Sequence, residues 1–187
     1  MRHPMMSVLE QNPVLPAVKD AGRLEACLAQ PAGVVFLLCG DILNIDRLID
    51  RVHQAGKYAV VHADLVAGLA PREIAVDFLH RCGADGIIST RPALIRRARH
   101  LGLLTVQRAF ILDSLSLDNL PAQLSVGKPD FIEILPGIMP RVISELAQKT
   151  RTPIIAGGLV KYKDEVMAAI RAGAVAVSTS SRTVWEM

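Results

Sequence analysis

The amino-acid sequence predicts an α/β protein, a single compact (β/α)8 barrel of the TIM type with short loops. Short runs rich in Val, Ile and Leu recur eight times with little polar alternation, as expected of parallel strands that are buried on both faces. Stretches with the helical spacing of apolar residues separate these runs. The chain has 187 residues, 51% of them hydrophobic, which is enough for one sizeable core and short for two domains.

The eight expected strands are spread along nearly the whole chain. They are Val14–Lys19, Val34–Gly40, Tyr58–Leu65, Gly86–Thr90, Leu104–Phe110, Phe131–Leu135, Pro153–Gly157 and Val175–Ser178. Strands that alternate with helices form either an open doubly wound sheet or a closed barrel, and the number eight favours the barrel. We expect residues 1–12 to form an N-terminal extension that covers the barrel floor, and residues 13–187 to form the barrel.

The expected helices show apolar faces and recognisable ends. The two clearest faces consist of Ile45, Leu48, Ile49 and Val52, and of Leu94, Ile95, Ala98 and Leu101. Helix starts are predicted at Asn44, as an N-cap, and at Pro71 and Pro92, in first turns. Helix ends are predicted by the glycines that follow apolar helical runs, namely Gly56, Gly83, Gly102 and Gly173.

Composition excludes several classes of protein. The net charge of +3 permits an anionic partner without demanding one. The three cysteines are odd in number and lack metal-type spacing, which indicates free thiols in a reducing cytosol. No apolar run reaches the length of a membrane span, and the first twelve residues lack the apolar stretch of a secretory signal. We therefore expect a cytoplasmic protein that does not contact membranes.

Two strand ends predict a phosphate site. Gly157 and Gly158 end the seventh expected strand, and Ser178 and Thr179 end the eighth. In a barrel the loops after these two strands commonly bind phosphate. Glycines let bare N–H groups face an anion, a helix N-terminus adds its positive dipole, and hydroxyl groups donate further hydrogen bonds. The alternative is that the glycines only form a tight turn and the hydroxyls only cap a helix.

Charged side chains near the other strand ends form a second candidate group, which consists of Lys19, Asp41, His62, Asp64, Arg108 and Glu133. Buried charges are costly unless they are paired, so Arg108 with Glu133, and Lys19 with either aspartate, are plausible pairs. The group is either a structural ion network or a site that hydrogen-bonds a small polyol or sugar. His62 has no second histidine near it at a strand end, so we expect no metal.

The same side chains could support catalysis. Lysine, histidine, aspartate and glutamate in one barrel mouth suffice for acid–base or Schiff-base chemistry. However, the sixth and seventh expected strands hold no lysine, and Lys161 lies beyond the glycine turn. The residues alone therefore leave two functions open, a phosphosugar isomerase or lyase and a non-catalytic sensor of a phosphorylated ligand.

Seven sequence blocks resemble the glycerol-3-phosphate-responsive antiterminator (GlpP) family. They are VVFLLCGDILNID, VVHADLVAGL, EIAVDF, ADGIISTRPALIRRARHLGLLTVQRAFILDSLSL, KPDFIEILPGIMP, PIIAGGLV and AVAVSTSSRTVWEM. The resemblance runs from about Pro13 to Met187. It implies a barrel without catalytic activity or cofactor that binds glycerol 3-phosphate. It further implies that the protein then acts on the leader mRNA of glycerol-catabolic genes and prevents premature termination of transcription.

The resemblance also assigns roles to the candidate residues. The phosphate is expected at Gly157, Gly158, Ser178 and Thr179, and the glycerol hydroxyls near the charged group described above. For RNA, Arg96 and Arg99 point outward from the apolar face that begins at Leu94, Arg97 flanks them and Arg91 precedes them, which forms a basic face suited to phosphates. The alternatives are that this face is merely solvated, or that the protein regulates through a protein partner. A homo-oligomer is also possible.

Overall fold

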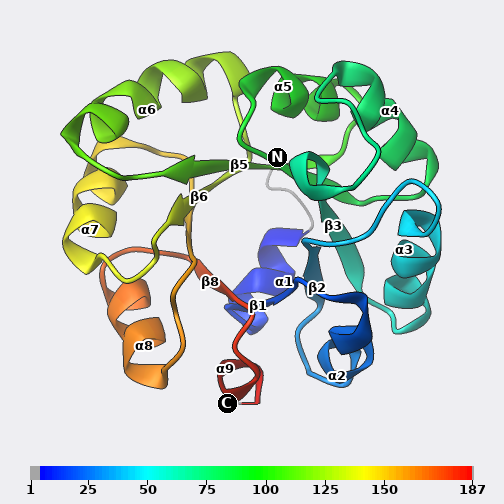
Figure 1. Cartoon of the computed structure of the whole chain (residues 1–187). Helices are drawn as coiled ribbons and strands as arrows, with labels where there is room; N and C mark the ends of the chain where they lie inside the picture. Colours follow the sequence, from blue (N-terminus) through cyan, green and yellow to red (C-terminus); the bar gives the residue numbers. More distant parts are fainter. Residues whose placement is uncertain (1–4, 187) are drawn as a thin grey trace.

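The strands in residues 5–186, the part of the chain that the computed structural model describes, close into a barrel of eight parallel strands (Figure 1). They are β1 (Val14–Val18), β2 (Val34–Leu37), β3 (Tyr58–His62), β4 (Gly86–Ser89), β5 (Leu104–Phe110), β6 (Phe131–Leu135), β7 (Ile154–Gly157) and β8 (Ala176–Thr179). Each strand pairs with the next in the sequence, and β1 pairs with β8, where Leu15 lies opposite Ser178. The predicted barrel is therefore confirmed, and the open sheet is excluded.

Apart from the N-terminal helix, the helices surround the strands on the outside of the barrel (Figure 1). The α-helices are α1 (Met5–Gln11), α2 (Leu24–Leu28), α3 (Ile45–Gln54), α4 (Glu73–Arg81), α5 (Pro92–His100), α6 (Ser114–Gly127), α7 (Pro140–Lys149), α8 (Lys163–Arg171) and α9 (Arg182–Trp185). Two short 3-10 helices, η1 (Ala21–Arg23) and η2 (Ala63–Leu65), follow β1 and β3. The outward faces of the strands pack against the apolar helix faces in two large clusters.

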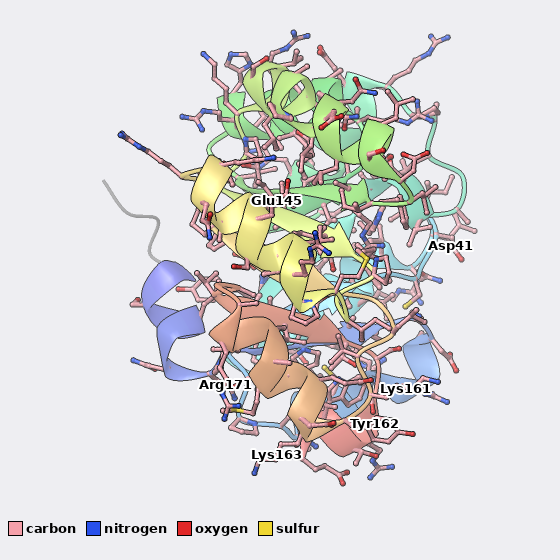
Figure 2. The ribbon with its side chains drawn as sticks, turned by 90° about the vertical axis from the view of Figure 1, so that its left-hand side faces the viewer. Asp41, Glu145, Lys161, Tyr162, Lys163 and Arg171 are labelled. Atoms are coloured by element: carbon pink, nitrogen blue, oxygen red, sulfur yellow. The ribbon has the colours of Figure 1, made fainter. Side chains whose placement is uncertain are left out.

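The inside of the barrel is a packed apolar core that α1 closes at the amino ends of the strands. Leu9 of α1 is buried and belongs to the same cluster as Leu15, Phe36 and Phe131, which line the barrel interior. In Figure 2, α1 lies at one end of the barrel and Lys161 and Tyr162, which follow β7, at the opposite end. Access to the barrel interior is therefore through the carboxyl end, where functional sites of this architecture lie.

Most predicted helix ends are confirmed, but two starts differ from expectation. Pro92 is the first residue of α5, as predicted, whereas Pro71 lies outside α4, whose N-cap is Arg72. Asn44 occupies the N-cap of α3, but its side-chain oxygen accepts from the N–H of Asp41 at 2.9 Å instead of capping the helix. The four glycines predicted at helix ends, Gly56, Gly83, Gly102 and Gly173, have φ values of +71°, +89°, +76° and +110°.

Candidate functional site: a cationic cavity at the carboxyl end of the barrel

A cavity of about 380 Å³ opens at the carboxyl end of the barrel. This volume is at the lower end of the range for small-molecule sites, so the cavity suits a small ligand. Its walls come from the ends of β1, β2, β5, β6, β7 and β8 and the loops that follow them. The lining residues are Ala17, Lys19, Leu38, Arg108, Phe110, Glu133, Leu135, Gly158, Leu159, Val160, Lys161, Ser178, Thr179, Ser180 and Ser181.

Three buried polar side chains form a chain of contacts across the cavity floor. Arg108 and Glu133 lie opposite each other on β5 and β6, and the Nε–H of Arg108 donates to Glu133 Oε2 at 2.6 Å. The hydroxyl of Ser178 on β8 donates to the other carboxylate oxygen, Oε1. Arg108 is 8% exposed and Glu133 only 1%. The expected Arg108–Glu133 pair is thus confirmed, and both oxygens of the carboxylate have a partner.

The cavity has a net positive charge. In the described part of the chain its lining holds three cationic side chains, Lys19, Arg108 and Lys161, against the single carboxylate of Glu133. Within residues 5–186, the one hydrogen bond that the Arg108 side chain donates comes from its Nε–H, so its other guanidinium N–H groups remain available for a ligand. A low-dielectric pocket with excess positive charge favours an anionic ligand.

The two glycines at the end of β7 are required for different reasons. A Cβ on Gly157 would lie 2.6 Å from Glu133 Oε1 and 2.7 Å from Ser178 Oγ, so a side chain there would disrupt the floor of the cavity. Gly158 has φ +73°, a left-handed conformation that glycine adopts at little cost. The next residue, Leu159, also has a positive φ, of +63°. The backbone thus turns sharply at the cavity, as the glycine pair predicted.

Thr179 holds the two loops together rather than presenting its hydroxyl to the cavity. Its Oγ1 donates to the carbonyl of Val160 at 2.6 Å and accepts from the N–H of Ser181 at 3.0 Å. The indole N–H of Trp185 donates to the carbonyl of Thr179 at 2.7 Å. The start of α8 is occupied as well, because Glu165 accepts the N–H groups of Lys161 and Tyr162. Backbone donors for an anion would therefore come from the loop segment 158–160 and from Ser180, beside the cationic side chains of the cavity.

Three predicted polyol residues, Asp41, His62 and Asp64, lie outside the cavity lining, and the two aspartates are engaged in local hydrogen bonds. The carboxylate of Asp41 accepts from the N–H of Leu43 and from the side-chain amide of Asn44, both at 2.8 Å. Asp64 accepts from the Ser89 hydroxyl at 3.0 Å and from the N–H of Thr90 at 2.7 Å. Both aspartates thus stabilise loops, and neither forms an ion pair with Lys19 among the described residues.

His62 is buried within the influence of the Arg108 charge and is neutral near pH 7. The side chain, on β3, is 2% exposed, and its Nδ1 has no hydrogen-bond partner among the described residues; it lies 3.9 Å from Asp64 Oδ2. Burial, reinforced by the positive charge of Arg108, lowers the pKa of His62 to about 4, although Asp64 opposes this shift. A neutral imidazole has one donor and one acceptor nitrogen, so it can donate a hydrogen bond to a hydroxyl group or accept one from it without adding charge.

We expect His62 to make the protein less stable in mild acid. Its pKa is about 4 in the folded chain and 6.5 in the unfolded chain, so the unfolded chain binds more protons between these values. The free energy of unfolding should therefore fall as the pH drops from about 6.5 to 4, by roughly 3 kcal/mol in total. In His62→Asn this part of the pH dependence should vanish, whereas His100→Asn on the surface should retain it. Urea unfolding at a series of pH values measures both.

The sequence missed part of the cavity. Phe110, Leu159 and Lys161 line it but were not predicted as site residues. Leu159 and Lys161 lie within three residues of Gly158, so their closeness to the glycine turn could have predicted that they line the cavity. Phe110 ends β5, as the expected strand bounds had it, but an apolar side chain at a strand end is not a signal of a cavity in the sequence. Lys19, predicted as the last residue of β1, instead follows the end of that strand.

Comparison with known proteins identifies the family. A family model described as "Glycerol-3-phosphate responsive antiterminator" matches residues 14–185. The chain belongs to the glycerol-3-phosphate responsive antiterminator family. The protein YgcP of Escherichia coli is 40% identical over 185 residues, which cover 98% of this chain and 97% of YgcP.

Two solved structures resemble this antiterminator family member closely. The glycerol uptake operon antiterminator regulatory protein from Listeria monocytogenes is 35% identical, with a TM-score of 0.90 and coverage of 94% of this chain and 95% of that one. An antiterminator-related protein from Thermotoga maritima is 33% identical, with a TM-score of 0.83 and coverage of 93% and 98%. Sugar-phosphate aldolases and an epimerase at 13–15% identity share the fold alone.

The basic face expected to bind RNA is present in this family member, but neighbouring groups engage it. Arg96 lies 3.3 Å from Glu73 of α4, and Arg97 forms an ion pair with Asp77 of the same helix. Arg99 donates to the carbonyl of Lys128 at 2.7 Å, and Arg91 lies 3.7 Å from Asp64. The four arginines thus share one side of the barrel, where the acidic side chains of α4 and η2 offset part of the positive charge of this surface.

Two further features bear on the class of partner. Within residues 5–186, no helix is both long enough and apolar enough to cross a bilayer. The same residues contain no group of three or more His, Cys, Asp or Glu side chains that could hold a metal ion.

Proposed function

We propose that this protein is a glycerol 3-phosphate sensor that controls transcription antitermination in the cytoplasm. The observation that supports this proposal is the cationic cavity around Arg108, Glu133 and Ser178 in a chain of the antiterminator family. The phosphate would bind backbone N–H groups of the turn at Gly157 and Gly158 and of the segment that follows Ser178 and Thr179, with the ammonium group of Lys161 nearby; the Thr179 hydroxyl would hold the two loops together. The phosphate group is the charged part of the ligand, so it gains more than the glycerol part from the excess positive charge of the cavity.

The glycerol part of the ligand would point toward the floor of the cavity. Arg108 offers guanidinium N–H donors there, and Glu133 offers carboxylate oxygens, so the two together match the donor and acceptor sides of a hydroxyl group. Lys19 borders the same space. His62 would contribute through its neutral ring, whereas Asp41 and Asp64 would act indirectly, by holding their loops in place.

Substitution of Gly158 tests the phosphate site against a matched control. Gly158 and Gly56 have nearly equal φ values, +73° and +71°, so alanine costs similar backbone strain at both positions, about 1 kcal/mol. A Cβ at Gly158 would lie 3.0 Å from Leu135 Cδ2 beside the cavity, whereas a Cβ at Gly56 would meet nothing within 4 Å. We expect Gly158→Ala to weaken binding of glycerol 3-phosphate at least ~10-fold, and Gly56→Ala to bind as the wild type does.

Calorimetric titration with glycerol 3-phosphate measures this effect, with glycerol and inorganic phosphate as comparison ligands. Absence of binding to the wild-type protein would contradict the sensor proposal. Equal losses in both variants would show that strain, and not the cavity, is responsible.

A phosphosugar isomerase or lyase remains the second candidate function, because aldolases and an epimerase share this fold. The inward position on β6 holds Glu133, which is ion-paired, and the two lysines of the cavity are exposed on the loops after β1 and β7. These positions support binding better than Schiff-base catalysis, which requires a desolvated amine. Mass spectrometry of the ligand recovered after titration distinguishes the two functions: an altered ligand would favour the enzyme.

We further propose that the ligand-bound protein binds leader mRNA through the arginines on and before α5, namely Arg91, Arg96, Arg97 and Arg99. Replacing Arg96, Arg97 and Arg99 by glutamine should weaken binding and reduce the salt dependence of affinity by about two in the logarithmic slope. A matched control replaces Arg47, Arg141 and Arg171, which are exposed elsewhere, and removes the same total charge.

The measurement is filter binding to the leader transcript of a glycerol-catabolic gene with glycerol 3-phosphate present. If the α5 variant and its control keep the same slope as the wild type, the RNA contact lies on another surface.

A further inference from the structure

Exposed apolar side chains gather at the end of β5 and on the segments that follow β5, β6 and β7. We define the β5–β7 rim by six of them, which are Phe110, Leu112, Leu115, Ile138, Leu159 and Tyr162. Their exposed fractions run from 42% for Ile138 to 82% for Leu112. Because β5, β6 and β7 are successive neighbours in the barrel, the loops that carry these residues leave adjacent strand ends. The rim thus forms one arc of the carboxyl end, on the side where Figure 2 shows Tyr162.

The rim is almost free of charge. Segments 110–117, 136–139 and 157–162, which hold the six rim residues, contain two charged residues, Asp113 and the cavity-lining Lys161. The carboxylate of Asp113 caps α6 by accepting from the N–H of Ser116 at 2.8 Å, so it is engaged within the chain. Depletion of charge together with enrichment in aromatic side chains is typical of the centre of a protein–protein interface. A solvated surface would be expected to carry more charged groups.

The size of the rim matches one side of a specific interface. The exposed fractions of the six residues correspond to about 700 Å² of accessible surface. This exceeds the largest apolar patch of a typical monomer, about 300–600 Å², and approaches the ~800 Å² that each partner contributes to an interface of standard size. A surface of this extent is expected to be covered in the working protein.

We infer that a second copy of this chain covers the β5–β7 rim. A two-fold axis brings the same patch of each copy together, so an apolar, nearly uncharged patch meets matching chemistry without repulsion. RNA does not suit the rim, because phosphates need more positive charge than the single Lys161 supplies there. The second copy is also present at the same concentration as the first, which suits a surface that requires continuous cover.

The pairing bears on the ligand site because the rim and the cavity share residues. Phe110 and Leu159 belong to the rim and also line the cavity. A partner seated on the rim therefore alters the surroundings of the cavity entrance. Association and ligand binding are then coupled, and each must change the equilibrium of the other by the same factor.

Sedimentation equilibrium over a range of micromolar concentrations tests the inference. We expect the wild-type protein to be a dimer, and the variant Leu112→Glu/Leu115→Glu to be a monomer with a dissociation constant raised at least ~100-fold. Both glutamates fall near the N-terminus of α6, where negative charge is tolerated. The matched control, Met167→Glu/Val175→Glu, changes two exposed apolar residues outside the rim and should remain a dimer.

Each outcome is decisive. Circular dichroism first establishes that both variants are folded, and the measurement is made with and without glycerol 3-phosphate. A wild-type dimer in either condition that the rim variant alone abolishes supports the inference. A wild-type monomer in both conditions, a rim variant as dimeric as the wild type, or a monomer that instead sediments with lipid vesicles overturns it. Because association is measured separately from ligand binding, this result does not depend on the proposed sensor function.

Discussion

Replacing Arg108 by methionine is expected to lower the free energy of unfolding by about 3–5 kcal/mol. The change leaves the carboxylate of Glu133, which is only 1% exposed, without its cationic partner. An unpaired charge at that depth is costly because the interior cannot solvate it. Replacing both residues, in Arg108→Met/Glu133→Leu, should restore most of the lost stability, since no buried charge then remains. Guanidinium unfolding curves of the three proteins measure these differences.

The double variant separates stability from ligand binding. It should fold, yet it should not bind glycerol 3-phosphate detectably in calorimetry, because the donors and acceptors at the cavity floor are gone. Arg51→Met serves as the control, since its partner Glu25 is exposed and a surface pair contributes less than about 1 kcal/mol. If the single and double variants were equally unstable, the loss would reflect packing of the arginine rather than the stranded carboxylate.

The second large effect is expected from Gly157→Ala. The new methyl group would lie within 3 Å of both Glu133 Oε1 and Ser178 Oγ, so these groups must move apart. Strain of this kind typically costs about 1–3 kcal/mol of stability. The hydroxyl of Ser178 would lose its bond to Glu133, and we expect affinity for glycerol 3-phosphate to fall at least ~100-fold, because displacements of about 1 Å have effects of this size.

Gly22→Ala is the matched control for this variant. Neither glycine has a positive φ, and a Cβ on Gly22 would make only ordinary contact, 3.5 Å from Asp20 Oδ1. Thermal unfolding and calorimetric titration of both variants give the comparison. Wild-type affinity in Gly157→Ala would mean that the ligand binds without the Glu133–Ser178 contact.

The barrel was predictable because its determinants are local and repeated. Segments such as Val34–Leu37 and Ile154–Gly157 are apolar on both faces, and this pattern requires cover inside and outside the sheet. The glycine pair at 157–158 predicted the position of the cavity. Where side chains approach the backbone this closely, only glycine fits, and this requirement is visible in the sequence. The Arg108–Glu133 pair followed from the high cost of leaving either charge alone inside a barrel.

The remaining features depend on contacts that spacing along the chain does not reveal. Asp41 and Asp64 were indistinguishable in sequence from cavity residues, but the nearest donors belong to their own loop or to the end of β4. The ion pairs of Arg96 and Arg97 arise from the packing of α4 against α5, which the helical periodicity of one segment cannot show. Thr179 was recognised as a donor, but its actual acceptor, the carbonyl of Val160, lies 19 residues away.

The hydrogen bond between Trp185 and Thr179 gives the molecule an intrinsic fluorescent probe of the cavity. Trp185 is the single tryptophan of the chain and is buried, and its indole donates to the carbonyl of a residue that lines the cavity. Indole emission responds to hydrogen bonding and to nearby charge. An anion that enters the cavity should therefore change the intensity or wavelength of this one fluorophore, and occupancy could be followed in real time without any label.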